Sequence, residues 1–256
     1  MPRNIIIHYH LFKNAGTSLD QSLMTNFMEG WHTHEGKATG WESGDVCDYL
    51  VAHDEVLALS SHTALFPVPN IRDTKIYPII FIRHPIDRVR SIYDFERKQT
   101  DMTEGSRMAK ILDLCGFVEW RLSRKGDRSI RNFQSSRFCG VVDSASAGGA
   151  SEAQRALLSI DALPFIGIVE QYDASLARLQ NWLSPAFPGI RLLPTRANVT
   201  QRGDQTLDER LAALRAELGP LLYQALLDAN ESDMDLYKAV LAHLARKSTL
   251  TNPVAI

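Results

Sequence analysis

The sequence predicts an α/β fold in which a mostly parallel central sheet is covered by helices on both faces, in three layers. Short β-branched runs alternate along the chain with segments whose apolar residues recur at helical spacing, and such alternation is typical of parallel sheets. The chain has 256 residues, 45% hydrophobic and 23% charged, which suffices to bury a core. We expect a single domain over residues 1–247 and a loose tail over 248–256.

The first strand is predicted at residues 5–9, where isoleucines precede a tyrosine. A turn-forming segment follows at 13–18, and an apolar stripe at helical spacing then predicts a helix. Residues 30–50 are expected to be irregular, because glycines recur through them, and a second strand is expected at 55–60. The helical stripe consists of Leu19, Leu23 and Phe27.

The strongest strand signal lies at residues 76–82, although Pro78 indicates that the first part of this strand sits at an end or an edge of the sheet. Pro85 then opens a helix, because proline is favoured in the first helical turn. Two helices are expected within 106–140, followed by a small-residue linker at 143–151.

The remaining elements are a buried strand at 165–169, a helix at 174–183 and a polar loop at 194–206. From Leu207 to about Lys247 the leucine spacing predicts amphipathic helices with a break at the Gly219-Pro220 pair.

The composition argues against several classes of protein. The 28 basic and 30 acidic residues give a net charge of −2, which argues against a general nucleic-acid binder. No apolar run reaches the roughly 18 residues of a membrane span, and we expect neither a signal peptide nor membrane insertion. The cysteines are few and widely spaced, which fits neither a disulfide framework nor a zinc knuckle and indicates a reducing compartment. They are Cys47, Cys115 and Cys139.

Residues 10–18, after the first strand, have the composition of an anion-binding loop. Gly16 allows close backbone approach, Thr17 and Ser18 can add hydroxyl donors at the helix start, and Lys13 adds a positive charge. This is not a Walker A motif, in which lysine directly precedes serine or threonine. A capped helix beside an exposed lysine is the alternative interpretation.

The run from His10 to Ser18 resembles the 5′-phosphosulfate loop of sulfotransferases that use 3′-phosphoadenosine 5′-phosphosulfate (PAPS), which would make the fold P-loop-like. It is most similar to the branch of heparan sulfate 2-O- and 6-O-sulfotransferases and their bacterial relatives. Phe12 and Asn14 depart from that branch, which has a proline and a hydroxyl residue there. The resemblance implies that the nucleotide is held by Lys13, Asn14, Ala15, Gly16, Thr17 and Ser18.

A second anion site is expected where Arg83 ends a strand and Ser91 lies on the second turn of the next helix, because both side chains can converge on one phosphate. The segment resembles the family's 3′-phosphate site, which implies that these two residues bind the 3′-phosphate of PAPS. Arg88 and Arg90 are interpreted as a solvated helix face.

Looser likenesses to the same family lie at residues 132–138 and 165–175. The loop at 198–202 falls where relatives close over the nucleotide. Asn198 and Arg202 are therefore candidate binding residues, with an ordinary loop as the alternative.

Sulfuryl transfer needs in-line positioning, charge stabilisation on the leaving oxygen and a base for the acceptor hydroxyl. Lys13 suits the leaving side. His62 follows the strand at 55–60 and matches the position at which relatives carry a base histidine. His32, His34 and Glu35 are the alternatives for the base, or could line an acceptor pocket.

No metal site is predicted. His8 and His10 alternate on the first strand and so face one side, as a metal pair could. We see no cysteine or carboxylate nearby to act as a third ligand, and sulfuryl transfer needs no catalytic metal. His84 is interpreted as scaffolding at a helix start.

The leading interpretation is a PAPS-dependent sulfotransferase acting on a hydroxyl acceptor, expected to be a glycan or sugar conjugate. It predicts binding of 3′-phosphoadenosine 5′-phosphate (PAP) without Mg²⁺. A P-loop kinase or a non-catalytic nucleotide- or glycan-binding module is the alternative. A cytoplasmic location is expected, because Golgi relatives begin with a membrane anchor and stem, whereas this sequence starts at the expected catalytic domain. A cluster that could meet an acidic glycan, or form a solvated face, comprises Arg121, Arg124, Lys125, Arg128 and Arg131.

Overall fold

The computed structural model describes residues 2–37, 40–193 and 205–251. The chain divides into two compact units, each made of two segments. The first contains Met1–Ile82 and Ser136–Thr200, and the second contains Arg83–Ser135 and Gln201–Ile256.

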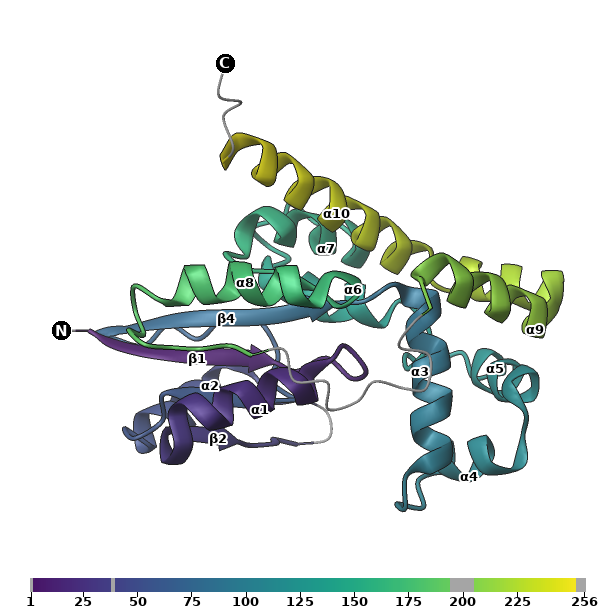
Figure 1. The fold of residues 1–256 in the computed structure, drawn as a ribbon, viewed down its shortest axis with the longest axis horizontal. Coiled ribbons are helices and arrows are strands. Elements are labelled where there is room, and N and C mark those ends of the chain that lie inside the picture. The colour runs from purple at the N-terminus through teal and green to yellow at the C-terminus, as the bar shows by residue number, and fades with distance from the viewer. Residues whose placement is uncertain (1, 38–39, 194–204, 252–256) are drawn as a thin grey trace. The chain divides into compact units, whose positions relative to one another are not determined.

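The first unit holds a five-stranded parallel sheet in the order β2-β3-β1-β4-β5 (Figure 1). The fold class predicted from the sequence is confirmed. The strands are β1 (Arg3–Tyr9), β2 (Trp31–Thr33), β3 (Ala58–Ser61), β4 (Thr74–Ile82) and β5 (Gly167–Ile168).

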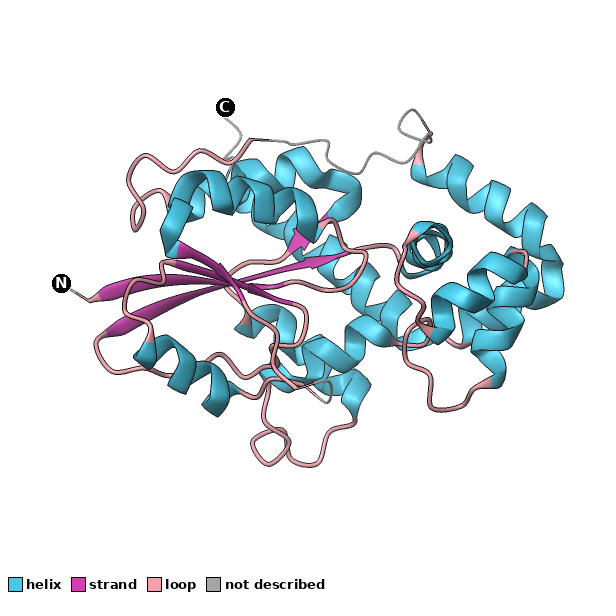
Figure 2. Ribbon diagram, turned by 90° about the horizontal axis from the view of Figure 1, so that it is seen from below, coloured by secondary structure: helices cyan, strands magenta, loops and turns pink. Residues whose placement is uncertain are grey.

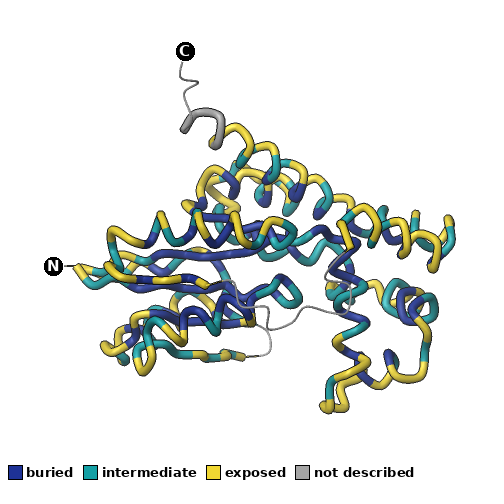
Figure 3. The backbone as a smooth tube through the Cα atoms, viewed as in Figure 1, coloured by how far each residue is buried: buried dark blue, intermediate teal, exposed yellow. Residues whose placement is uncertain are grey.

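The strand β1 lies at the centre of the sheet, between β3 and β4. The chain leaves β1 to form β2 and β3 on one side and then crosses to β4 on the other side. In parallel α/β sheets, ligands bind beyond the carboxyl ends of the strands at such a reversal of strand order. Figure 3 shows the central strands as buried backbone (Figure 3).

Helices flank the strands on either side (Figure 2). One face of the sheet packs against α1 (Gly16–Phe27) and α8 (Tyr172–Leu183). Ile6 from β1, Leu19 from α1 and Leu179 from α8 are completely buried in this core. The neighbouring strands and helices thus exclude water from the isoleucine run of β1. Burial of apolar surface stabilises a fold by roughly 25 cal/mol per Å², so this run lies at the centre of the core.

Residues 30–50 were expected to be irregular, and this prediction is wrong. They contain β2 and α2 (Ser43–Ala52), whose buried side chains Val46 and Leu50 lie four residues apart, on one helical face. The glycines fall at the ends of elements and in the intervening loop, and Gly44 lies in the first turn of α2, so their number concealed this helix.

Pro78 lies in the part of β4 that pairs with β1, whereas the described β4–β5 pairing is confined to Phe81 and Ile82. The sequence expectation that this proline sits at an edge is therefore confirmed. A further helix of the first unit is α7 (Glu152–Ala162), at whose start Ser151 and Gln154 form a reciprocal capping box.

The second unit is helical, and three helices replace the two expected over residues 106–140. As predicted, α3 begins at Pro85 and α9 is broken at Gly219, where φ is 73°. The last helix continues to Thr251, beyond the expected end near Lys247. The helices are α3 (Pro85–Lys98), α4 (Glu104–Ile111), α5 (Leu114–Ser123), α9 (Leu207–Asp228) and α10 (Glu231–Thr251); α6 (Phe133–Phe138) lies where the two units join in sequence.

Among the described residues, no helix is both long enough and apolar enough to cross a bilayer. The three cysteines are free thiols.

Candidate functional site

The loop between β1 and α1 has a strongly bent backbone. Lys13 and Ala15 both have positive φ, 65° and 60°, a conformation that L-residues seldom adopt. The Asn14 side chain is buried and donates a hydrogen bond to the Phe81 carbonyl at 2.7 Å, which ties the loop to the end of β4. Asn14, predicted as a nucleotide ligand, is therefore an anchor of the loop in this structure.

Gly16 opens α1 and lies directly against the imidazole of His10. A Cβ atom at position 16 would lie 2.0 Å from His10 Cδ2 and 2.1 Å from His10 Nε2. The close approach that the sequence assigned to an anion is thus made by a histidine ring. Thr17 is exposed and Ser18 is buried, and the helix has no side-chain cap at Ala15, so its first turn keeps the polarity that favours anions.

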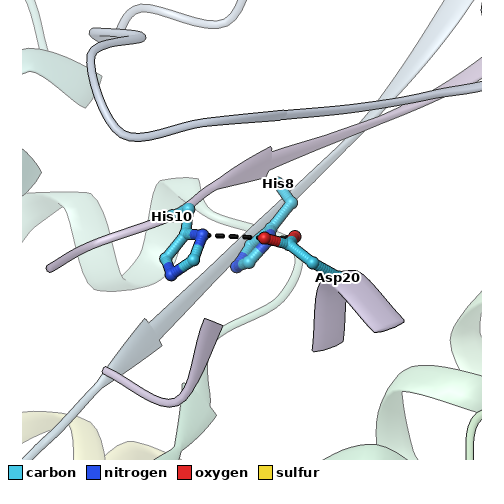
Figure 4. A group of neighbouring side chains, drawn as sticks. All are labelled: His8, His10 and Asp20. Atoms are coloured by element: carbon cyan, nitrogen blue, oxygen red, sulfur yellow. Dashed lines mark hydrogen bonds and ion pairs between the residues drawn. The ribbon is translucent and has the colours of Figure 1, made fainter. Parts of the chain in front are cut away.

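Two histidines of the first strand and its extension converge on one carboxylate from α1 (Figure 4). His8 Nδ1 lies 2.7 Å from Asp20 Oδ1, and His10 Nδ1 lies 2.9 Å from Asp20 Oδ2. Ser60 of β3 donates its hydroxyl to Asp20 Oδ1 at 2.5 Å. Burial raises the pKa of Asp20, but the two imidazoles outweigh burial and hold this pKa far below its usual range, so the carboxylate is ionised.

No sequence pattern singled out Asp20 as a partner of the two histidines, and the expectation that no carboxylate lies near them is wrong. Gly16 and Asp20 are four residues apart and therefore share one face of α1. Because Gly16 must pack on His10, that face turns the Asp20 carboxylate toward the same ring. This spacing is the signal that could have found it.

His62 lies next to His10 because of the sheet register. Tyr9 pairs with Ser61, so the two histidines follow side by side, with ring centroids 3.9 Å apart in a stacked arrangement. Nearly half of the His62 side chain is exposed. The predicted position of His62 at the carboxyl edge beside the loop is confirmed.

Glu35 holds His62 in place. Its Oε1 lies 2.8 Å from His62 Nδ1, and the carboxylate also accepts from the backbone amides of His62 and Thr63 at 3.0 Å. Burial raises the pKa of Glu35, but these hydrogen bonds prevail and lower the pKa below its usual value. Glu35, considered as an alternative base, is thus the ionised partner of His62.

His32 and His34 belong to a separate aromatic group. His32 Nδ1 lies 2.9 Å from the Tyr49 hydroxyl, and the His34 ring stacks on Tyr49 with centroids 4.5 Å apart. Both rings thus contact Tyr49 of α2, and His34 also contacts Trp41, whereas the ring that stacks on His62 is that of His10.

In the second unit, Arg83 pairs with Asp87, with Nη2 2.6 Å from Oδ2. Asp87 also receives Arg210 Nε at 2.8 Å on Oδ1. The three side chains carry a net positive charge, since two guanidinium groups share one carboxylate. Ser91 lies half-buried two turns into α3.

The backbone at Arg83 is held by Gln134, whose Oε1 accepts from the Arg83 amide at 2.9 Å and whose Nε2 donates to the Arg83 carbonyl at 2.8 Å. Asp233 of α10 in turn accepts from the amides of Gln134 and Ser135 and from the Ser135 hydroxyl. His84 is buried, and burial lowers its pKa to about 4.

Arg88 and Arg90 do not form the solvated face that the sequence suggested. Arg88 is 1% exposed and donates to the Ser129 carbonyl, with its guanidinium over the Phe133 ring. Arg90 pairs with Asp94 and Glu217. Guanidinium groups pack well on aromatic rings, so the Arg88 side chain is part of the packed interior of the second unit.

The basic cluster proposed to meet an acidic glycan is partly committed to internal ion pairs. Arg121 pairs with Glu96 and Asp127 and is mostly buried, and Arg124 makes a bidentate pair with Glu104. The candidates Asn198 and Arg202 lie outside the described residues.

No protein-family model matches the chain. The chain is 35% identical over 247 residues to an uncharacterized protein of Archaeoglobus fulgidus, and the match covers 94% of this chain and 97% of the relative. The two proteins thus correspond over nearly their full lengths. The protein belongs to the family of this archaeal protein.

Proposed function

We propose that the protein is a sulfotransferase that moves a sulfuryl group from PAPS to a hydroxyl acceptor of the carbohydrate class. The observation that carries the proposal is the meeting of the loop at residues 10–18 with the histidine–glutamate pair His62–Glu35 at neighbouring strand ends. This is the edge at which parallel α/β sheets bind their ligands.

The loop fits the 5′-phosphosulfate group in its charge and its helix. Lys13 is cationic, and α1 begins at Gly16 without a side-chain cap, which leaves its first turn electrostatically suited to an anion. Thr17 is exposed and adds a hydroxyl. Asn14 contributes indirectly, because its amide fixes the loop to β4.

In the proposed reaction the acceptor oxygen attacks the sulfur atom while the bond between sulfur and the bridging phosphate oxygen breaks. His62 takes the proton of the acceptor hydroxyl, and PAP leaves with the electron pair of the broken bond. Lys13 neutralises the charge that develops on the leaving oxygen. Glu35 holds His62 Nδ1 at 2.8 Å, so that Nε2 is the nitrogen available to the acceptor.

The 3′-phosphate is assigned to Arg83 and Ser91 of the second unit. Arg83 is already oriented by Asp87, and the net positive charge it shares with Arg210 supports binding of a phosphate. The Gln134 clamp fixes the Arg83 backbone, which reduces the entropy that the side chain must lose on binding.

A kinase of the P-loop type is the alternative enzyme. Such enzymes hold Mg²⁺ with a carboxylate at the end of a neighbouring strand. Here β3 is followed by His62 and β4 by Arg83 and His84, which favours a metal-independent transfer.

Calorimetric titration with PAP, with ATP and Mg²⁺ as the comparison, tests which nucleotide the protein binds. Micromolar PAP binding without Mg²⁺ is expected, with at least a tenfold loss in Arg83→Ala. Arg72→Ala is the matched control, because Arg72 is almost fully exposed and forms an ion pair with its exposed neighbour Asp73. Preferred binding of ATP with Mg²⁺ would contradict the proposal and favour the kinase.

Consumption of PAPS with a panel of unsulfated glycans separates an enzyme from a binding module. His62→Ala should abolish the acceptor-dependent formation of PAP while PAP binding stays within a factor of about three of the unmodified protein. Glu35→Gln should lower the rate less than His62→Ala does. An acceptor-dependent rate that is unchanged in His62→Ala would remove His62 as the base.

A further inference from the structure

His8, His10 and Asp20 form a compact group that sulfuryl transfer does not use. Each offers one ligand atom, and these atoms all lie within 4.8 Å of one another. The histidines come from β1 and its extension and the carboxylate from α1, so two elements of the first unit fix the group (Figure 4).

The surroundings of this triad are buried. His8 and His10 are 1% and 7% exposed, and the Asp20 side chain is 18% exposed. The Asp20 carboxylate places a negative charge in these poorly hydrated surroundings. A cation bound there would balance that charge, and the partial exposure of Asp20 gives an ion a way in from solvent.

The donor set selects a class of ion. Two imidazoles and one carboxylate suit Zn²⁺ and neighbouring divalent transition metals, whereas Ca²⁺ and Mg²⁺ prefer oxygen ligands alone. Ligand atoms of a tetrahedral Zn²⁺ at about 2.1 Å lie about 3.4 Å apart. Since the ligand atoms of the triad lie within 4.8 Å of one another, the widest pair would have to close by at most about 1.4 Å.

Both imidazoles already face the same carboxylate. Nδ1 of His8 and Nδ1 of His10 approach different oxygens of the same carboxylate, at 2.7 and 2.9 Å. A neutral imidazole that keeps its proton on Nε2 presents the Nδ1 lone pair, so metal binding requires this tautomer together with the closing movement. The Ser60 hydroxyl donates to Asp20 Oδ1 at 2.5 Å and lies 3.3 Å from His8 Nδ1, so it supports the carboxylate beside His8.

We propose that His8, His10 and Asp20 form a binding site for a divalent transition-metal ion, with Zn²⁺ as the preferred ion. Three protein ligands leave a further coordination position for water. The site goes beyond the proposed sulfuryl transfer and does not depend on it. The competing arrangement is a closed hydrogen-bonded cluster in which both imidazoles donate to the carboxylate.

Calorimetric titration of the tag-free, EDTA-treated full chain with ZnCl₂ tests the site. One Zn²⁺ per chain is expected, with the affinity at least about 100-fold weaker in Asp20→Asn and His8→Gln. The matched control is His32→Gln, because His32 lies 3.7 Å from the carboxylate of Glu55 in the same unit but outside the triad. Its affinity should equal that of the unmodified protein.

A second measurement on the unmodified protein keeps the test decisive if a variant fails to fold. Zn²⁺ should shift the ring nitrogen resonances of His8 and His10 in a ¹⁵N spectrum, and Co²⁺ should give the visible absorption of a low-symmetry site. Zinc binding that persists in both triad variants, or ring resonances that do not respond to Zn²⁺, would overturn the proposal and leave a hydrogen-bonded cluster.

Discussion

Replacement of Gly16 by alanine tests the contact on which the loop and the histidine cluster both depend. The added Cβ would lie 2.0 Å from His10 Cδ2, whereas ordinary contacts of this kind begin near 3.4 Å. The ring cannot easily retreat, because His62 stacks on it at 3.9 Å and Asp20 holds its Nδ1 at 2.9 Å. Overpacking of this kind costs about 1–3 kcal/mol, and we expect about 2 kcal/mol.

Urea unfolding at pH 7 measures the effect, and Gly44→Ala is the matched control. Gly44 also lies in the first turn of a helix, but nothing lies within 4 Å of its Cβ position. Alanine there should leave stability unchanged or raise it by up to about 1 kcal/mol, through helix propensity.

A double-mutant cycle identifies the cause. In a His10→Ala background the imidazole is gone, so Gly16→Ala should cost nothing measurable. If Gly16→Ala costs the same with and without the His10 ring, or behaves like Gly44→Ala, the explanation of the glycine by its contact with His10 is refuted.

Three further predictions concern the second unit. The buried imidazole of His84 has a pKa of about 4 against 6.5 when unfolded, so the unfolded chain takes up the proton first as pH falls. The free energy of unfolding should therefore drop by about 2 kcal/mol between pH 7 and 5, and His84→Gln should remove this part of the pH dependence. Asp233→Ala leaves two buried amides without their acceptor and should lower the free energy of unfolding, measured with urea, by about 3 kcal/mol or more. The exposed control Asp235→Ala should lower it by under about 0.5 kcal/mol, and equal losses would contradict the capping role of Asp233. Gly219→Ala must adopt φ 73° and should lower stability by about 1–3 kcal/mol, whereas Gly126→Ala, with open space around it, should be neutral by the same assay.

The elements that position the candidate site could be predicted from sequence because their signals are local. The isoleucines of β1, the break before Gly16 and the helix-opening Pro85 each act within a few residues. The elements missed at residues 30–50 are short, and β2 has only three residues, too few for an alternation to show.

Contacts of the candidate site that join residues distant in the chain could not be predicted from the sequence. Glu35 reaches His62 only through the pairing of β2 with β3, and Asp20 reaches His8 only once α1 has folded back on the sheet. The composition around Arg88 resembles an exposed helix, yet the ring of Phe133 covers its guanidinium. Such contacts depend on tertiary packing, which no local pattern encodes.

The link from Asp233 through Gln134 to the Arg83 backbone has a consequence for biosynthesis. A ribosome makes the chain from its N-terminus, so Arg83 emerges long before Gln134, and the cap on Gln134 arrives only with α10. A nascent chain paused before Glu231 therefore carries the Arg83 segment without its final support. The second unit can complete its fold only after α10 has been synthesised, and truncations that remove α10 should yield chains that chaperones and proteases recognise as unfinished.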